Sequence, residues 1–153
     1  SGVTREYVSN PPLHPSHPER GTRRIDVRPK DGAARLLISR PDLKSLIETK
    51  FVRLMELFNI EVLKADASSC EARFHSETYE ESKRLNAPLL HWVPEDGCIK
   101  ASVVMPTADV KTGMAEPMLT SEAVGNIVQL TRFGFARVDE TANDSARLYF
   151  AHE

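Results

Sequence analysis

Apolar and polar residues alternate along most of this chain, and each alternating run is short. The runs that predict strands are 22–27, 34–39, 70–75, 89–93, 98–105, 110–115, 125–130, 133–138 and 147–151. Turn-forming residues separate them, as in Pro-Glu-Asp-Gly at 94–97 and Asn-Asp-Ser at 143–145. Short strands punctuated by turns are typical of an all-β barrel or sandwich.

Some stretches do not fit the simple alternating pattern. The run FVRLMELFNIEVLKA at 51–65 suits either a helix or strands by periodicity, and we favour strands that form a hairpin with 70–75. The polar run at 77–85 is the best helix candidate, and 44–49 could form one helical turn. Four prolines within 10–21 exclude a helix interior or a central strand, so we expect an extended opening segment over 1–21.

Composition narrows the class of protein. The chain has 153 residues, of which 41% are hydrophobic, enough for a packed core. No apolar run approaches the ~20 residues of a membrane helix, so we expect no membrane partner. Two cysteines, Cys70 and Cys98, are too few for a disulfide scaffold, which favours a reducing, cytoplasmic location. Ser1 and Gly2 in place of an initiator Met suggest part of a larger protein.

Charge is distributed unevenly. Residues 1–64 contain 12 Lys and Arg against 8 Asp and Glu, whereas 65–153 contain 8 against 14. A protein that wraps DNA or another bulk polyanion would be more basic, so we expect no DNA partner. A local basic patch that reads a few nucleotides remains compatible with these numbers.

Catalytic signatures are missing. The sequence contains no P-loop, no GxGxxG, no GxSxG and no HExxH motif. His14 and His17 lie three residues apart but have no CxxC companion, so we interpret them as surface or capping residues and expect no metal site. Cys98 has no basic neighbour that would activate it, and we interpret it as a buried thiol. We assign no catalytic residue.

One constellation suggests recognition of RNA. Gln129, Arg132, Phe133 and Phe135 lie within VQLTRFGFARVD. Gln and Arg side chains read base edges, and aromatic rings stack on unpaired bases. A bulge or turn between Gln129 and Arg132 would be needed to bring both to one pocket. The alternative is an ordinary strand with solvent-facing polar residues.

A basic run surrounds the first predicted strand, 22–27. It consists of Arg20, Arg23, Arg24 and Arg28. These side chains would suit phosphate groups or would simply keep the surface soluble.

Six motifs together resemble one family. They are HPERGTR at 17–23, VRLMELFN at 52–59, LLHWVPEDG at 89–97, AEPML at 115–119, GNIVQLTRFGFARVD at 125–139 and YFAH at 149–152. In this order they resemble the C-terminal anticodon-binding region of archaeal and eukaryotic-type glutamyl-tRNA synthetases, with glutaminyl-tRNA synthetases as relatives that share the architecture. The resemblance covers about residues 11–152.

The resemblance implies an all-β fold of two small antiparallel β-barrels with one or two short helices. After the opening segment 1–21, residues 22–52 and 115–153 would form a discontinuous first barrel, and 53–114 would form the second. The family's catalytic motifs are absent from the chain. The resemblance therefore implies a region of a ligase that attaches glutamate with ATP and Mg²⁺, that is not catalytic alone and that binds no cofactor itself.

The resemblance also implies partners and site residues. The partners would be tRNA(Glu), with tRNA(Gln) as an open alternative, and the catalytic domain of the same parent chain. The central uridine of the anticodon would lie in a pocket built from Arg23, Gln129 and Arg132, and Arg53 would contact a neighbouring base. Arg20, Arg24 and Arg28 would contact the tRNA backbone. The alternatives are the same region of a glutaminyl-tRNA synthetase or a β-barrel domain that docks a protein.

Overall fold

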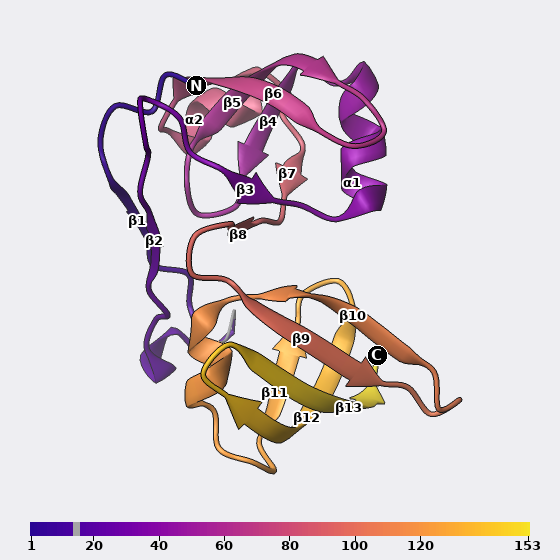
Figure 1. Cartoon of the computed structure of the whole chain (residues 1–153). Helices are drawn as coiled ribbons and strands as arrows, with labels where there is room; N and C mark the ends of the chain where they lie inside the picture. The colour runs from indigo at the N-terminus through magenta and orange to yellow at the C-terminus, as the bar shows by residue number, and fades with distance from the viewer. Residues whose placement is uncertain (14–15) are drawn as a thin grey trace. The chain divides into compact units, whose positions relative to one another are not determined.

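Short strands dominate the computed structural model of the chain, which describes residues 1–13 and 16–153 (Figure 1). The contacts divide the chain into two units, Ser1–Asp96 and Gly97–Glu153. The predicted all-β class and its two short α-helices are confirmed. Within the described residues, no helix is long and apolar enough to cross a membrane.

Among its described residues, the first unit contains eight short strands and most of the helical residues. Its strands are β1 (Tyr7–Ser9), β2 (Ile25–Val27), β3 (Leu36–Leu37), β4 (Phe51–Leu54), β5 (Asn59–Ala65), β6 (Cys70–Ser76), β7 (Leu89–Leu90) and β8 (Val93–Pro94). Its helices are η1 (Pro18–Arg20), α1 (Arg40–Ser45), η2 (Leu46–Glu48) and α2 (Tyr79–Arg84). Its largest sheet has the order β6-β5-β4-β7, and β1 pairs with β2 and β3 with β8.

Strands β4, β5 and β6 confirm the hairpin interpretation of the ambiguous run. Val52 and Leu54 of β4 and Phe58, just before β5, are almost completely buried. Phe58 lies edge-on to Tyr7 and to Phe74, with ring centroids 5.0 and 5.4 Å apart. Phe58 belongs to the first core, and Tyr7 and Phe74 pack against that core.

Both α-helices begin at a residue that caps them. The Ser39 hydroxyl accepts a hydrogen bond from the Asp42 amide at 3.2 Å, and Thr78 accepts one from Glu81 at 3.3 Å. Helix α1 starts at Arg40 because the Ser39 cap and Pro41 in the first turn favour a helix there. The predicted helical turn over 44–49 forms the end of α1 and η2.

The second unit is built on one five-stranded sheet with the order β10-β9-β13-β12-β11. Its elements are β9 (Ile99–Val104), β10 (Val110–Ala115), η3 (Pro117–Ser121), β11 (Ile127–Leu130), β12 (Gly134–Ala142) and β13 (Ser145–His152). Its inner face packs Ile99, Val103, Val138 and Leu148 together with Leu119 of η3. Every pairing is antiparallel except that of β13 with β9.

The two units differ from the expected domain boundaries. We expected 22–52 with 115–153 in one domain and 53–114 in the other. Instead β13 pairs in parallel with β9, which places 99–115 in the same sheet as 127–152. Strands β2 and β3, within 22–52, pair with β1 and β8 of the first unit. Alternation predicts each strand but not its partner, because pairing is decided by contacts distant in sequence. Closure of either unit into a barrel stays a prediction.

Candidate nucleic-acid interface

Gln129 lies on β11, the edge strand of the five-stranded sheet. Its neighbours Val128 and Leu130 pack against the core, so Gln129 points to the opposite face and is exposed. Its register partner on β12 is Phe135. Directly paired residues share a face, so the predicted amide and the predicted aromatic ring lie side by side.

Arg132 lies in the turn between β11 and β12. The Phe133 amide donates to the Leu130 carbonyl at 2.9 Å and closes this turn, and Arg132 is exposed within it. Its φ of 63° places a bulky side chain in the left-handed region, a conformation more common at functional sites than elsewhere. A turn thus follows Gln129 and contains Arg132, and the meeting of the two side chains in one pocket stays a prediction.

The end of β13 completes this corner of the sheet. The Phe135 and His152 rings stack with centroids 4.6 Å apart and an interplanar angle of 26°. A Cβ at Gly134 would lie 2.8 Å from the His152 carbonyl oxygen and 2.9 Å from the Phe150 ring, and the φ of Gly134 is 133°. Only glycine fits this position, so Gly134 allows β13 to approach and places His152 beside Phe135.

His152 was missed by the sequence reasoning although it lies in the YFAH motif. A register shift between Phe135 and Ala136 sets His152 opposite Phe135 and Phe150 opposite Ala136. Simple alternation would put His152 on the same face as Phe150. A bulge of this kind adds a residue to one strand and changes which face the following side chain meets, so it has no signal in the hydrophobic pattern.

Arg53 lies on β4 in the first unit, where it is held from two sides. Its guanidinium donates to the Glu77 carbonyl at 2.7 Å and, at 3.4 Å, to the Asn59 side-chain oxygen. Asn59 is completely buried, and its amide donates to the Ser76 hydroxyl at 2.9 Å and to the Thr78 carbonyl at 2.8 Å. Arg53 is half-buried, so part of its donor capacity already serves the fold.

Arg23 also belongs to the first unit. Its backbone amide donates to the Pro11 carbonyl at 2.9 Å, and its guanidinium donates to the Pro12 carbonyl at 3.1 Å. These bonds fix Arg23 against the proline-rich opening segment. The meeting of Arg23 with Gln129 and Arg132 in one pocket stays a prediction.

The remaining arginines of the basic run differ in their charge environment. Arg24 and Arg28 both bind the carboxylate of Asp26, at 2.8 and 3.2 Å. Asp26 therefore offsets part of the positive charge that we expected to face tRNA phosphates. Arg20 is exposed at the end of η1.

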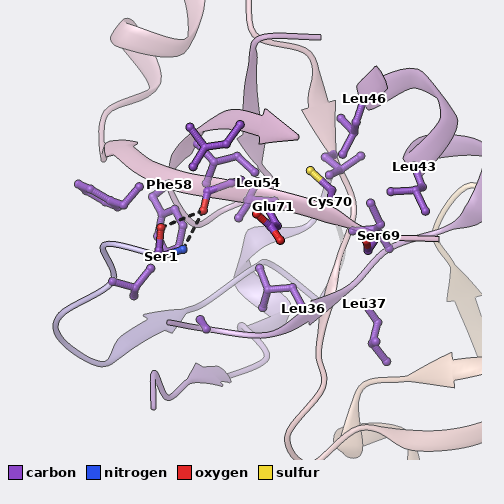
Figure 2. A pocket seen from close by; sticks show the side chains of 18 of the residues that line it. Ser1, Leu36, Leu37, Leu43, Leu46, Leu54, Phe58, Ser69, Cys70 and Glu71 are labelled. Carbon is purple, nitrogen blue, oxygen red and sulfur yellow. Dashed lines mark hydrogen bonds between the residues drawn. The ribbon is translucent and has the colours of Figure 1, made fainter. Parts of the chain in front are cut away.

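An apolar cavity of about 520 Å³ lies in the first unit (Figure 2). Its lining includes Leu36, Leu43, Leu46, Phe58 and Cys70. Burial raises the pKa of the Cys70 thiol, which therefore stays protonated and is a poor nucleophile. The side chains that line the cavity are thus mainly apolar.

Metal-binding groups are not assembled in the part of the chain that the structure covers, where no three His, Cys, Asp or Glu side chains come together. His17 lies 2.9 Å from the Glu19 carboxylate, and His14 falls outside the described residues.

Trp92 is a core residue of the first unit. It is buried, and its indole N–H donates to the Met55 carbonyl at 3.0 Å.

Two family models match the chain. Both are described as the anti-codon binding domain of class I tRNA synthetases (E and Q), and they cover residues 2–79 and 89–139. Among curated relatives, the glutamate–tRNA ligase of Methanopyrus kandleri is 34% identical over 152 residues, which are 99% of this chain and 26% of that protein. The glutamate–tRNA ligase of Pyrococcus abyssi is 36% identical over 151 residues, 97% of this chain and 25% of that ligase. The chain thus spans about a quarter of the length of these relatives.

Proposed function

Because the chain belongs to the anticodon-binding domains of the class I tRNA synthetases for glutamate and glutamine, we propose that it reads the anticodon loop of a tRNA on behalf of a glutamate–tRNA ligase. The named relatives are glutamate ligases, which supports tRNA(Glu) over tRNA(Gln) as the ligand. ATP and Mg²⁺ belong in this proposal to the catalytic domain of the parent ligase. No residue of this chain is assigned to them.

The observation that carries the proposal is the β11–β12 hairpin. An exposed Gln129 amide stands beside an aromatic ring on an edge strand, and an exposed arginine follows in the adjoining turn. Uracil presents two carbonyl acceptors and one N–H donor. The Arg132 guanidinium can donate to a carbonyl, and the Gln129 amide can donate to one and accept from the N–H. These groups therefore complement a splayed uracil, as single-stranded RNA presents it.

Arg23 is included in the proposed uridine site on the resemblance alone. Its guanidinium, which donates to the Pro12 carbonyl, is a group that can donate to a uracil carbonyl. Arg53 would contact a neighbouring base with the donors that Glu77 and Asn59 leave available. Arg20, Arg24 and Arg28 would contact backbone phosphates and contribute affinity without base preference.

The test is binding of an anticodon stem-loop to variants of the hairpin. Gln129→Ala and Arg132→Ala should each weaken binding by about 1–3 kcal/mol, the usual range for a base contact. Thr131→Ala is the matched control, because Thr131 is exposed in the same turn and has no assigned role. Binding that tolerates both Gln129→Ala and Arg132→Ala would refute the assignment of this hairpin.

A further inference from the structure

The outer face of the five-stranded sheet in the second unit carries an unusual set of side chains. Residues that alternate with the buried core positions point to this face. Paired residues form a row across all five strands, in the order Val110, Val104, Tyr149, Arg137 and Ile127. A second row contains Gln129, Phe135 and His152.

Large apolar side chains on this face are exposed. Tyr149 is 40% exposed, Ile127 54%, Val110 55% and Met114 43%. Isolated exposed apolar residues are common, but three in one row, on β10, β13 and β11, indicate a binding surface. The aromatic members lie at its centre and at the β11 corner, close to Gln129.

The polar residues of the face favour RNA over a protein as the partner. The Arg137 guanidinium lies 5.9 Å from the centre of the Tyr149 ring, and no carboxylate pairs with it among the described residues. Glu140, an acidic residue on the outer face of β12, lies 3.8 Å from Arg147. Lys100 also points outward from β9. Aromatic rings next to uncompensated cations are typical of surfaces that hold single-stranded nucleic acid.

We propose that the Tyr149–Arg137 pair and the Phe135–His152 pair form a stacking platform for unpaired nucleotides that adjoin the base contacted by Gln129. The two pairs lie on one face, two residues apart along β12, or roughly 7 Å. Tyr149 and the Phe135–His152 stack would each present a ring to a base, and Arg137 would contact a phosphate. This inference rests on the proposed function and extends it from reading one base to holding its neighbours.

The experiment measures the affinity of an anticodon stem-loop of a glutamate tRNA by fluorescence anisotropy. A series of stem-loops replaces each loop nucleotide in turn with an abasic residue, which keeps the phosphate and removes the base. The protein variants are Tyr149→Ser, which removes the ring, and Tyr149→Phe, which keeps it. Met114→Ser is the control, since Met114 has similar exposure on the same face but lies on the opposite edge strand, β10.

The platform predicts that Tyr149→Ser weakens binding about tenfold, the scale of one stacked base, while Tyr149→Phe and Met114→Ser bind like the original chain. One abasic position should weaken binding by the original chain about tenfold and have no effect on Tyr149→Ser. Unfolding midpoints should be unchanged, because Tyr149 lies outside the core.

The failures of the two proposals are distinguishable. If Tyr149→Ser binds normally while a change of the central uridine still abolishes binding, the platform is refuted and the face is left for a protein partner. If Tyr149 couples to a loop position but the central uridine has no effect, the platform stands and base reading by Gln129 is refuted. Absence of any binding to the stem-loop overturns both.

Discussion

The two candidate base-reading sites are built in opposite ways. Arg53 is half-buried and is held by the Glu77 carbonyl and by Asn59, which is itself completely buried. Gln129 and Arg132 are exposed on an edge strand and in the turn that follows it. The comparison shows that the Arg53 side chain is tied to buried groups of the first unit, whereas Gln129 and Arg132 lie on the exposed surface of the second unit.

The same contrast holds for the charged residues around each site. In the first unit Arg73 is paired with Glu61, Arg5 with Glu77, and Arg24 and Arg28 with Asp26. In the second unit Arg147 pairs with Glu140, but Arg137 lies against the Tyr149 ring and has no carboxylate partner among the described residues. Substitutions should therefore affect stability mainly in the first unit and binding mainly in the second.

The largest expected effect is on the Asn59 network. Asn59→Ala removes the amide that bonds Ser76 and Thr78 and leaves buried polar groups without partners. The free energy of unfolding should fall by about 3 kcal/mol, measured by urea denaturation. Gln129→Ala is the control and should leave unfolding unchanged. Equal stability of the two variants would contradict the view that the Asn59 network stabilises the fold whereas Gln129 does not.

Arg132→Gly tests the same comparison in the second unit. Glycine adopts a φ of 63° without the penalty that a larger side chain carries, roughly 1 kcal/mol. The variant should therefore keep or raise the thermal midpoint while its affinity for the stem-loop falls about tenfold or more. A parallel loss of stability and binding would mean that Arg132 supports the turn and does not read a base.

A smaller effect is expected at Asp26. Asp26→Asn removes the carboxylate shared by Arg24 and Arg28 and leaves both cations available to phosphates. Affinity for RNA at low salt should rise about threefold, and the dependence of affinity on salt should become steeper. An unchanged salt dependence would show that these arginines face away from the bound RNA.

The smallest effect is a pH dependence in the first unit. Hydrogen bonds from the Ser68 amide and hydroxyl and from the Ser69 amide lower the pKa of Asp66 from 3.8 to about 2. A lowered pKa in the folded chain means that Asp66 stabilises the fold above pH 4 and loses this effect as the pH falls toward 2. Asp66→Ala should thus reduce the unfolding midpoint at pH 6, and the difference from the original chain should shrink below pH 4. A constant difference would contradict the role of the charge.

Much of the fold could be predicted from local pattern. Alternation predicted the strands around Cys70, Ile99 and Val110, and a Thr at position 78 fits the start of the predicted helix. The partners of these strands could not be predicted, because the parallel pairing of β13 with β9 joins residues about 45 positions apart. The expected boundaries at 53 and 115 came from the resemblance, without any prediction of which strands pair.

The candidate site could also be predicted only in part from the sequence. Gln129 and Arg132 follow from residue type and from the motif, and both are exposed as a reading site requires. His152 and Tyr149 become part of the site only through the register of β13 against β12 and through the bulge beside Phe135. Residue type alone gives no sign that these two rings share a face with Gln129.

The central claim is that the chain reads the middle base of a glutamate anticodon. The most direct measurement is fluorescence anisotropy of the chain with an anticodon stem-loop of tRNA(Glu) and with the same stem-loop carrying another base in place of the central uridine. The account predicts that the change weakens binding by a factor of roughly ten or more, the scale of one base contact. Equal affinity for both stem-loops would contradict it, because binding would then depend on the phosphate backbone alone.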